Sequence, residues 1–251
     1  MIRVLRPLVA IGLALATWQG IIIAFEPPRF IFPSPARVAE TWWENRMLIA
    51  WHTGVTMSEV ALGLIIGVTV GCATALTLAT SGFARLALKP ILVFSQALPV
   101  FALAPILVLW LGYGMGSKIA MATLIIYFPV TSAFYDGLMR TPPGMLDLAN
   151  VMGASPRRIL WVIRVPAAIP SFVSGLRLAA VYAPIGAVIG EWVGASNGLG
   201  YLMLLANGRA KTDLMFAAMI TLGVCSVILY LVTLAATNRI APETPSNQPR
   251  G

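Results

Sequence analysis

Long apolar stretches separated by short polar segments dominate this chain of 251 residues. A helix needs about 20 apolar residues to cross the hydrocarbon core of a bilayer, which is about 30 Å thick. Six stretches reach or approach this length, at residues 4–25, 55–79, 91–111, 119–135, 166–191 and 214–236. The pattern therefore predicts an all-α, polytopic membrane protein with six transmembrane helices.

The overall composition agrees with this prediction. Hydrophobic residues make up 59% of the chain and charged residues only 10%, whereas about 25% of a soluble domain is charged. The net charge of +8 would suggest nucleic-acid binding in a soluble protein. In a membrane protein an excess of Lys and Arg usually reports orientation, so we expect a lipid membrane and no nucleic acid among its partners.

Two segments depart from a simple pattern of straight spans. The third predicted span, residues 91–111, contains Pro99 and Pro105, which predicts a bent helix that packs against protein. Residues 35–47 are mixed and amphipathic and include Trp42 and Trp43. Because tryptophan favours the membrane interface, we expect this segment to lie on the membrane surface.

Glycines recur every four residues in two of the predicted spans. This spacing places them on one helix face and lets another helix approach closely. The two sets are Gly63, Gly67 and Gly71, and Gly186, Gly190 and Gly194. We interpret both as ordinary sites of tight helix packing.

The longest polar-containing interruption lies between the fourth and fifth predicted spans. Thr141 is a candidate cap for a helix that starts at Pro142, and Gly153 is suited to end it in a left-handed conformation. Ser155 is a second capping residue, directly before a proline, and Pro166 is expected to end the second helix. The prediction is two short helices with a sharp turn between them, outside the membrane.

The distribution of basic residues predicts the orientation. With six spans, both termini lie on one side, which receives ten Lys or Arg residues: Arg3, Arg6, Arg85, Lys89, Arg140, Arg157, Arg158, Arg164, Arg239 and Arg250. The other side receives six, together with five acidic residues. The positive-inside rule therefore places both termini and the segment 141–166 in the cytoplasm.

This orientation divides the chain into three parts. Residues 1–50 would hold an N-terminal transmembrane helix and an extracytoplasmic amphipathic segment, residues 51–240 a transmembrane domain, and residues 241–251 a disordered cytoplasmic tail. A proline-rich exit after residue 25, in place of a small-residue cleavage pattern, favours a retained helix over a signal peptide.

The residues of a catalytic or metal site are missing from the sequence. The chain has one histidine, His52, which sits beside Trp51 at the start of an apolar run, where we expect an interfacial position. It has no Walker A sequence to bind ATP and no mid-membrane chain of acidic residues to relay protons or sodium. We therefore expect a transporter subunit that is not an enzyme and is driven by a partner docked on segment 141–166.

The same segment resembles a known family signature. D-L-A-x3-G-x9-I-x-V-P runs from Asp147 through Ala149, Gly153 and Ile163 to Pro166. It is similar to the E-A-A-x3-G-x9-I-x-L-P signature of permease subunits of ABC importers, from which it departs by having Asp for Glu, Leu for Ala and Val for Leu. In that family the segment forms coupling helices, so the resemblance assigns these five residues to contact with an ATPase subunit.

The resemblance also implies a fold, partners and a location. It implies a type I ABC importer permease fold, a homodimer of permeases, an ATP-binding cassette ATPase subunit and an extracytoplasmic substrate-binding protein. No cofactor would be bound by this chain, and ATP would be used by the partner subunit. The expected location is the inner (plasma) membrane, as a multi-pass protein.

Further stretches resemble one branch of the family, which imports nitrate, sulfonates, taurine and thiamine-pyrimidine precursors. These stretches are F-P-S-P, A-P-I-L-V-L-W-L-G-Y-G, F-P-V-T-S-A-F-Y-D-G-L, S-G-L-R-L-A and G-E-W-V-G-A-S-N-G-L-G-Y-L. S-Q-A-L-P-V-F-A-L-A-P and A-P-I-G-A-V-I-G-E-W are most similar to permeases for hydroxymethylpyrimidine or other thiamine precursors. This resemblance implies a hydroxymethylpyrimidine-like cargo, with nitrate, alkanesulfonate or taurine as the alternative.

Three polar residues within predicted spans are candidates for lining the substrate pathway: Gln96, Tyr182 and Glu191. Interhelical hydrogen bonds would explain Gln96 and Tyr182 equally, and an interfacial anchor would explain Glu191. A self-sufficient secondary transporter is the remaining alternative class, and the coupling signature argues against it.

Overall fold

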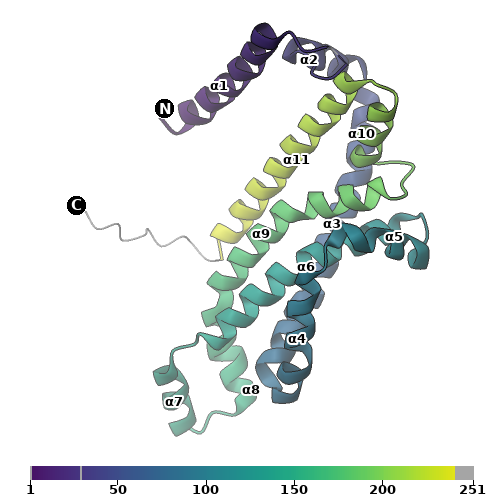
Figure 1. Cartoon of the computed structure of the whole chain (residues 1–251). Coiled ribbons are helices and arrows are strands. Elements are labelled where there is room, and N and C mark those ends of the chain that lie inside the picture. Colours follow the sequence, from purple (N-terminus) through teal and green to yellow (C-terminus); the bar gives the residue numbers. More distant parts are fainter. Residues whose placement is uncertain (1, 29, 241–251) are drawn as a thin grey trace. The chain divides into compact units, whose positions relative to one another are not determined.

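The computed structural model describes residues 2–28 and 30–240, with the side chains of residues 2–8, 96 and 97 excepted. Every regular element in this part of the chain is a helix (Figure 1). In order they are α1 (Ile2–Phe25), α2 (Pro35–Glu44), α3 (Arg46–Thr80), α4 (Gly82–Ala97), α5 (Val100–Leu111), α6 (Met115–Met139), α7 (Pro143–Val151), α8 (Pro156–Ile159), the π-helical turn η1 (Leu160–Arg164), α9 (Val165–Trp192), α10 (Leu199–Gly208) and α11 (Thr212–Asn238). The all-α prediction is confirmed, and the predicted tail 241–251 lies outside the described residues.

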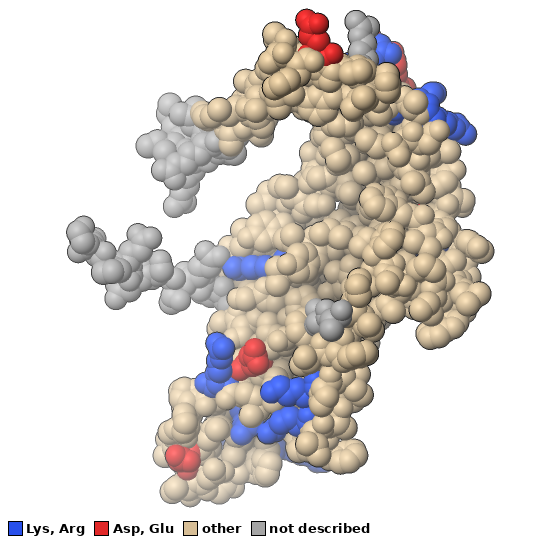
Figure 2. Space-filling model, viewed as in Figure 1, with Lys and Arg blue, Asp and Glu red and all other residues tan. Residues whose placement is uncertain are grey.

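Four helical segments are long and apolar enough to cross a membrane, and a bent pair makes a fifth. The four are Arg46–Thr80, Met115–Met139, Pro156–Trp192 and Thr212–Asn238, and the bent pair is Gly82–Ser95 with Val100–Leu111. Within the described residues the first of the six predicted spans is a shorter apolar helix, Val9–Phe25. Much of the visible surface is uncharged (tan in Figure 2), as expected for helices that face lipid or other helices.

The third predicted span is broken, as its prolines suggested. Helix α4 ends at Ala97, and α5 begins at Val100 with Pro99 as its extended N-cap residue. The two helices are sharply bent with respect to each other. Pro105 lies inside α5 without ending it, so the break occurs at Pro99 alone.

The chain divides into two compact units. Unit 1 comprises Met1–Thr56 and Ser196–Val224, and unit 2 comprises Met57–Ala195 and Cys225–Gly251. Unit 1 has an apolar core supplied by α2, α3, α10 and α11, with Val38, Ile49, Leu199, Leu202 and Ala217 among its buried members.

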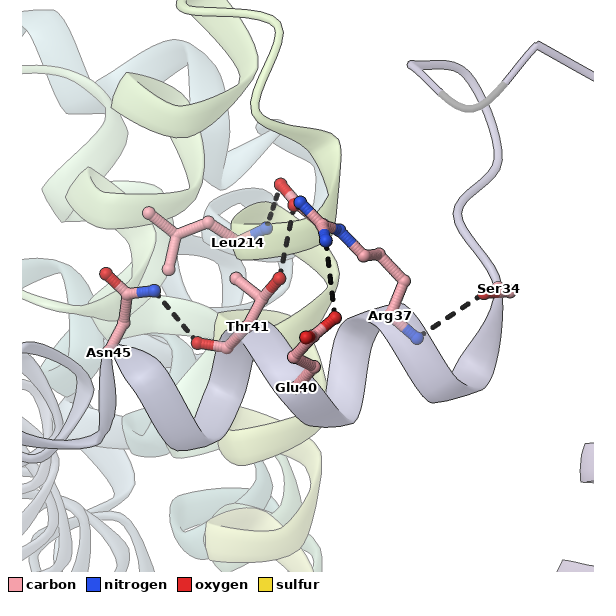
Figure 3. A network of polar contacts seen from close by, with 7 residues as sticks. Ser34, Arg37, Glu40, Thr41, Asn45 and Leu214 are labelled. Atoms are coloured by element: carbon pink, nitrogen blue, oxygen red, sulfur yellow. Dashed lines mark hydrogen bonds and ion pairs between the residues drawn. The ribbon is translucent and has the colours of Figure 1, made fainter.

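Polar contacts of unit 1 fix α2 in place (Figure 3). The Ser34 hydroxyl caps the helix by accepting a hydrogen bond from the Arg37 N–H at 3.4 Å. The Arg37 guanidinium lies 3.2 Å from the Glu40 carboxylate and 3.6 Å from that of Asp213, and Thr41 donates to Asp213 at 3.1 Å. The predicted surface segment is therefore a capped helix whose polar side is anchored to the start of α11.

His52 has a structural task that the sequence analysis did not anticipate. It is buried, and its Nδ1 accepts a hydrogen bond from the N–H of Gly198 at 3.0 Å. The Thr56 hydroxyl, one helical turn further along α3, accepts from the N–H of Leu199 at 2.8 Å. Two side chains of α3 thus satisfy free N–H groups at the start of α10, a role that the expected interfacial position of His52 did not include.

Unit 2 is built on close packing of α3, α6 and α9. A Cβ at Gly63 of α3 would lie 2.6 Å from the Cβ of Ala122, and a Cβ at Gly186 of α9 would lie 2.7 Å from the Cα of that same alanine. At Gly175 an added Cβ would lie 2.7 Å from the carbonyl oxygen of Pro129. Only glycine fits such contacts between closely packed helices, so the predicted tight packing is confirmed for the set in α3 and for Gly186 and Gly190. Gly194 lies beyond the end of α9 at Trp192, so its predicted place on the same helix face was wrong.

Candidate functional site

The segment 141–166 forms two short helices joined by a turn, within unit 2 (Figure 1). Helix α7 ends in a Schellman motif, in which the N–H of Gly153 bonds the carbonyl of Asn150 and the N–H of Ala154 bonds that of Ala149, both at 2.9 Å. Gly153 has a φ of +73°, the left-handed conformation that its sequence position predicted. The turn is therefore specified by backbone geometry and does not depend on contact with a partner.

The predicted start of this first helix was wrong in one detail. Pro142, not Thr141, is the N-cap residue, and it makes no side-chain capping bond. Thr141 is buried, and its hydroxyl donates to the carbonyl of Leu138 at 3.2 Å. Thr141 is thereby engaged with the end of α6, and a proline at each of the next two positions starts α7 without needing N–H partners.

The second helix starts as predicted and ends much later. The Ser155 hydroxyl accepts from the Arg158 N–H at 3.4 Å and caps α8. The helix does not stop at Pro166, because α8, η1 and α9 continue without a break to Trp192. The wide π turn directly before the proline, closed by the bond from the Val165 N–H to the Leu160 carbonyl, accommodates a residue that has no N–H and a bulky ring.

Helix α7 presents an exposed apolar face. Its members lie three and four residues apart, the spacing of one side of a helix, and are Met145, Leu148, Val151 and Met152, with exposed fractions of 55%, 62%, 86% and 77%. We call these four residues the α7 face. Asp147 and Gly153 are also exposed, whereas Ala149 on the other side of the helix is buried.

Exposed basic residues lie close to this apolar face in the sequence. Arg140, Arg157 and Arg158 are exposed on the segment and just before it. Figure 2 shows basic side chains, in blue, gathered at the end of unit 2 that carries α7 and α8. An apolar stripe on a capped helix, bordered by basic residues, is the kind of surface that an amphipathic helix offers to a partner's groove.

A second feature of unit 2 is a groove of about 720 Å³ along α6 and α9. Its walls are mostly apolar or aromatic, and its polar groups are the Ser132 hydroxyl, the Asp136 carboxylate and the Tyr182 hydroxyl. The lining residues are Val100, Leu124, Ile125, Phe128, Pro129, Ser132, Ala133, Asp136, Leu178, Tyr182 and Ile185, none of them Lys or Arg. From Leu124 to Asp136 the groove follows α6 for about 18 Å, at about 1.5 Å per residue.

Comparison with known proteins identifies the chain's family. Residues 63–244 match the family of binding-protein-dependent transport system inner membrane components. The chain belongs to this family. The resemblance noted from the 141–166 signature is thereby confirmed, and the chain is an ABC importer permease subunit.

Named relatives match nearly the whole permease. A probable ABC transporter permease protein of Haemophilus influenzae is 53% identical over 91% of this chain and 94% of its own length. The formylaminopyrimidine transport permease protein ThiX of Halalkalibacterium halodurans is 34% identical, covering 85% of this chain and 86% of its own. The riboflavin transport system permease protein RibX of Chloroflexus aurantiacus is also 34% identical, covering 89% and 84%.

The fold of the permease has a solved counterpart. A chain of the MetNI methionine ABC transporter in an inward-facing conformation superposes with a TM-score of 0.62 over 79% of this chain and 96% of that chain. The sequences are 18% identical, so the likeness concerns the fold alone. It agrees with the predicted type I importer permease architecture.

Of the two pathway candidates whose side chains the structure describes, only one lies in the groove. Tyr182 lines the groove, whereas Glu191 is fully buried and is absent from its lining. Gln96 belongs to α4, and its side chain lies outside the described part of the structure. Asp136 and Ser132 were not among the predicted pathway residues, although both follow from Tyr182 once α6 and α9 are known to be neighbours.

The described residues contain no group of three or more His, Cys, Asp or Glu side chains placed to hold a metal ion.

Proposed function

We propose that this permease forms the translocation pathway of an ATP-driven importer and receives mechanical work through segment 141–166. The observation that carries the proposal is the α7 face, an apolar surface on a helix whose end is fixed by a Schellman motif. A rigid helix transmits a displacement of its partner, whereas a flexible loop would absorb it. The assigned coupling residues are Asp147, Ala149, Gly153, Ile163 and Pro166, and we add the α7 face to them.

The structure suggests different tasks for these residues. Gly153 supplies the left-handed turn, and Ala149, which is buried, lets α7 pack against the rest of unit 2. Asp147 is exposed and available to pair with a basic residue of the partner. Ile163 lies in the π turn that leads from α8 into α9, the path along which a movement of α7 and α8 would reach the groove.

This arrangement supports a set of proposed partners. An ATP-binding cassette ATPase subunit docks on the α7 face in the cytoplasm, where both termini also lie, and a substrate-binding protein delivers cargo on the other side. ATP is bound and used by the ATPase, and this chain binds no cofactor. Two copies of the permease assemble as a homodimer, because the groove is open and the Leu178, Tyr182 and Ile185 side chains on its α9 wall are exposed.

The groove favours a neutral or cationic flat cargo. Asp136 and Tyr182 offer hydrogen-bond acceptors to ring N–H and amino groups, and the Phe128 and Tyr182 rings offer stacking surfaces. A carboxylate without a neighbouring cation in the lining repels nitrate and sulfonate groups. We therefore propose an aminopyrimidine of the hydroxymethylpyrimidine type. The relatives named for formylaminopyrimidine and riboflavin, both flat nitrogen heterocycles, support this choice.

Transport by the reconstituted permease, with its ATPase and binding protein, tests the proposal. We expect binding-protein-dependent uptake of hydroxymethylpyrimidine, and we expect Asp136→Asn to lower that uptake while ATP hydrolysis continues. Uptake of taurine, an alkanesulfonate or nitrate in its place would establish the alternative cargo. Uptake driven by an ion gradient without any ATPase would establish a secondary transporter and overturn the proposal.

A further inference from the structure

Three charged side chains from different helices are buried inside unit 2. They are Glu59 of α3, Lys118 of α6 and Glu191 of α9, with exposed fractions of 3%, 2% and 1%. An uncompensated charge in such a place costs several kcal/mol. The three residues must therefore balance one another, and the contacts show how.

Lys118 is held by backbone carbonyls. Its ammonium donates to the carbonyl oxygens of Tyr113, of Gly114 at 2.9 Å and of Gly194 at 3.0 Å. An ammonium has three N–H donors, so these contacts use all of them. They fasten the turn after α5 to the turn after α9, but carbonyl dipoles do not neutralise a full positive charge.

The two glutamates supply the missing negative charge. If both were ionised, they would carry one negative charge more than Lys118 balances. Their side chains are hydrogen-bonded to each other, and both act electrostatically on Lys118. A hydrogen bond between two carboxyl groups requires a proton on one of them. The Glu59 Oε2 atom is buried and has no hydrogen-bond partner, which is tolerable for a neutral carboxylic acid and costly for a carboxylate.

The helices approach one another closely beside the three residues. A Cβ at Gly190 would lie 3.0 Å from the Cα of Lys118, and α3 meets α6 in the same way at Gly63 and Ala122. The backbones thus touch within about one turn of each charged residue. The charges must be balanced by the side chains themselves.

We propose that Glu59, Glu191 and Lys118 form a charge-balanced lock, in which the two carboxyl groups share one proton and carry a single negative charge that compensates Lys118. The lock joins α3, α6 and α9 through side chains that lie far apart in the sequence. It holds together α6 and α9, which line the groove, and none of its three residues belongs to the groove lining. It is independent of the cargo and of the ATPase assigned above.

Replacing each glutamate by glutamine tests the lock in the full-length permease. Gln resembles a protonated Glu in shape. Glu59→Gln and Glu191→Gln singly should each leave one ionisable carboxyl to balance Lys118, so both variants should stay close to the parent in extracted yield and melting temperature. The double variant leaves Lys118 uncompensated, and its yield as a monodisperse species should fall several-fold. Adding Lys118→Gln to the double variant removes the unbalanced charge and keeps amide N–H donors for the backbone carbonyls, so it should restore part of the yield.

The pattern distinguishes charge balance from simple loss of contacts. Glu26→Gln with Glu44→Gln, at two exposed glutamates, is the matched control and should stay close to the parent. If the triple variant remains as poor as the double variant, or if the double variant is as stable as either single one, the lock does not exist. If each single variant alone is as damaging as the double variant, both carboxylates are charged and the shared proton is wrong.

Discussion

The α7 face and the buried lock reverse the usual distribution of side chains in opposite ways. Met145, Leu148, Val151 and Met152 expose apolar surface beside basic residues, whereas Glu59, Lys118 and Glu191 bury charge among packed helices. Both arrangements cost free energy in the isolated chain. The comparison teaches that an exposed apolar surface calls for a partner from outside, whereas a buried charge must be balanced by other side chains of the same chain.

The comparison predicts that a charge placed in the α7 face acts on function and not on folding. Val151→Asp would put a carboxylate in the apolar contact and should lower ATP hydrolysis by the assembled transporter at least about tenfold, because burying an unpaired charge costs several kcal/mol. Binding-protein-stimulated ATPase activity in vesicles is the measurement. Asn150→Asp, an exposed residue of the same helix, is the control. Normal activity of Val151→Asp would remove the α7 face from the docking surface.

An added methyl group should be tolerated differently at Gly186 in the packed interior and at Gly144 on α7. At Gly186 a Cβ would lie 2.7 Å from the Cα of Ala122, which is backbone and cannot move aside. We expect Gly186→Ala to destabilise the permease by about 1–3 kcal/mol, measured by its melting temperature in detergent. At Gly144, near the start of α7, no atom lies within 4 Å of an added Cβ, so Gly144→Ala should be neutral. Equal stability of the two variants would contradict the close packing of α6 and α9.

Backbone conformation gives a smaller effect. Gly153 has open space around it but a φ of +73°, so Gly153→Ala should cost about 1–2 kcal/mol through conformation alone. Coupling should weaken while membrane insertion is unchanged, and Gly153→Asn should retain more activity because Asn adopts this conformation more readily. ATP hydrolysis driven at the parental rate by Gly153→Pro would overturn the assignment of the turn.

The smallest effect on stability is expected from an exposed ion pair. The Arg37–Glu40 contact of 3.2 Å has both side chains about 60% exposed, and such pairs contribute about 0–1 kcal/mol. Glu40→Gln should therefore shift the melting temperature by no more than a few degrees. A loss as large as that of the lock's double variant would mean that burial does not decide the cost of a charge in this molecule.

Local signals in the sequence were sufficient for much of segment 141–166. The Ser155 cap and the left-handed turn at Gly153 depend on residues within one or two turns, and both were predicted. The end of the second helix at Pro166 was wrong, because the π turn before it depends on how the chain enters α9. The Thr141 cap was wrong because the side chain is engaged by Leu138.

Tertiary contacts were harder to predict. Lys118 follows Gly112, Gly114 and Gly116, a spacing typical of a turn, yet it is buried in α6 by residues that lie about 60 to 75 positions away. Glu59 and Glu191 each look like isolated charges near the end of an apolar run. Only their convergence, which depends on the glycine-mediated approach of three helices, reveals the lock. The groove likewise required α6 and α9 to be known as neighbours.

Site-specific crosslinking from the α7 face tests most directly whether segment 141–166 receives the ATPase. A photoreactive amino acid is placed at Leu148 of the α7 face and, as a control, at Leu109 of α5, which is 82% exposed in an apolar helix. In vesicles that contain the whole transporter, we expect Leu148 to crosslink to the ATPase subunit and Leu109 not to do so. Crosslinking to the ATPase from Leu109 and none from Leu148 would contradict the account.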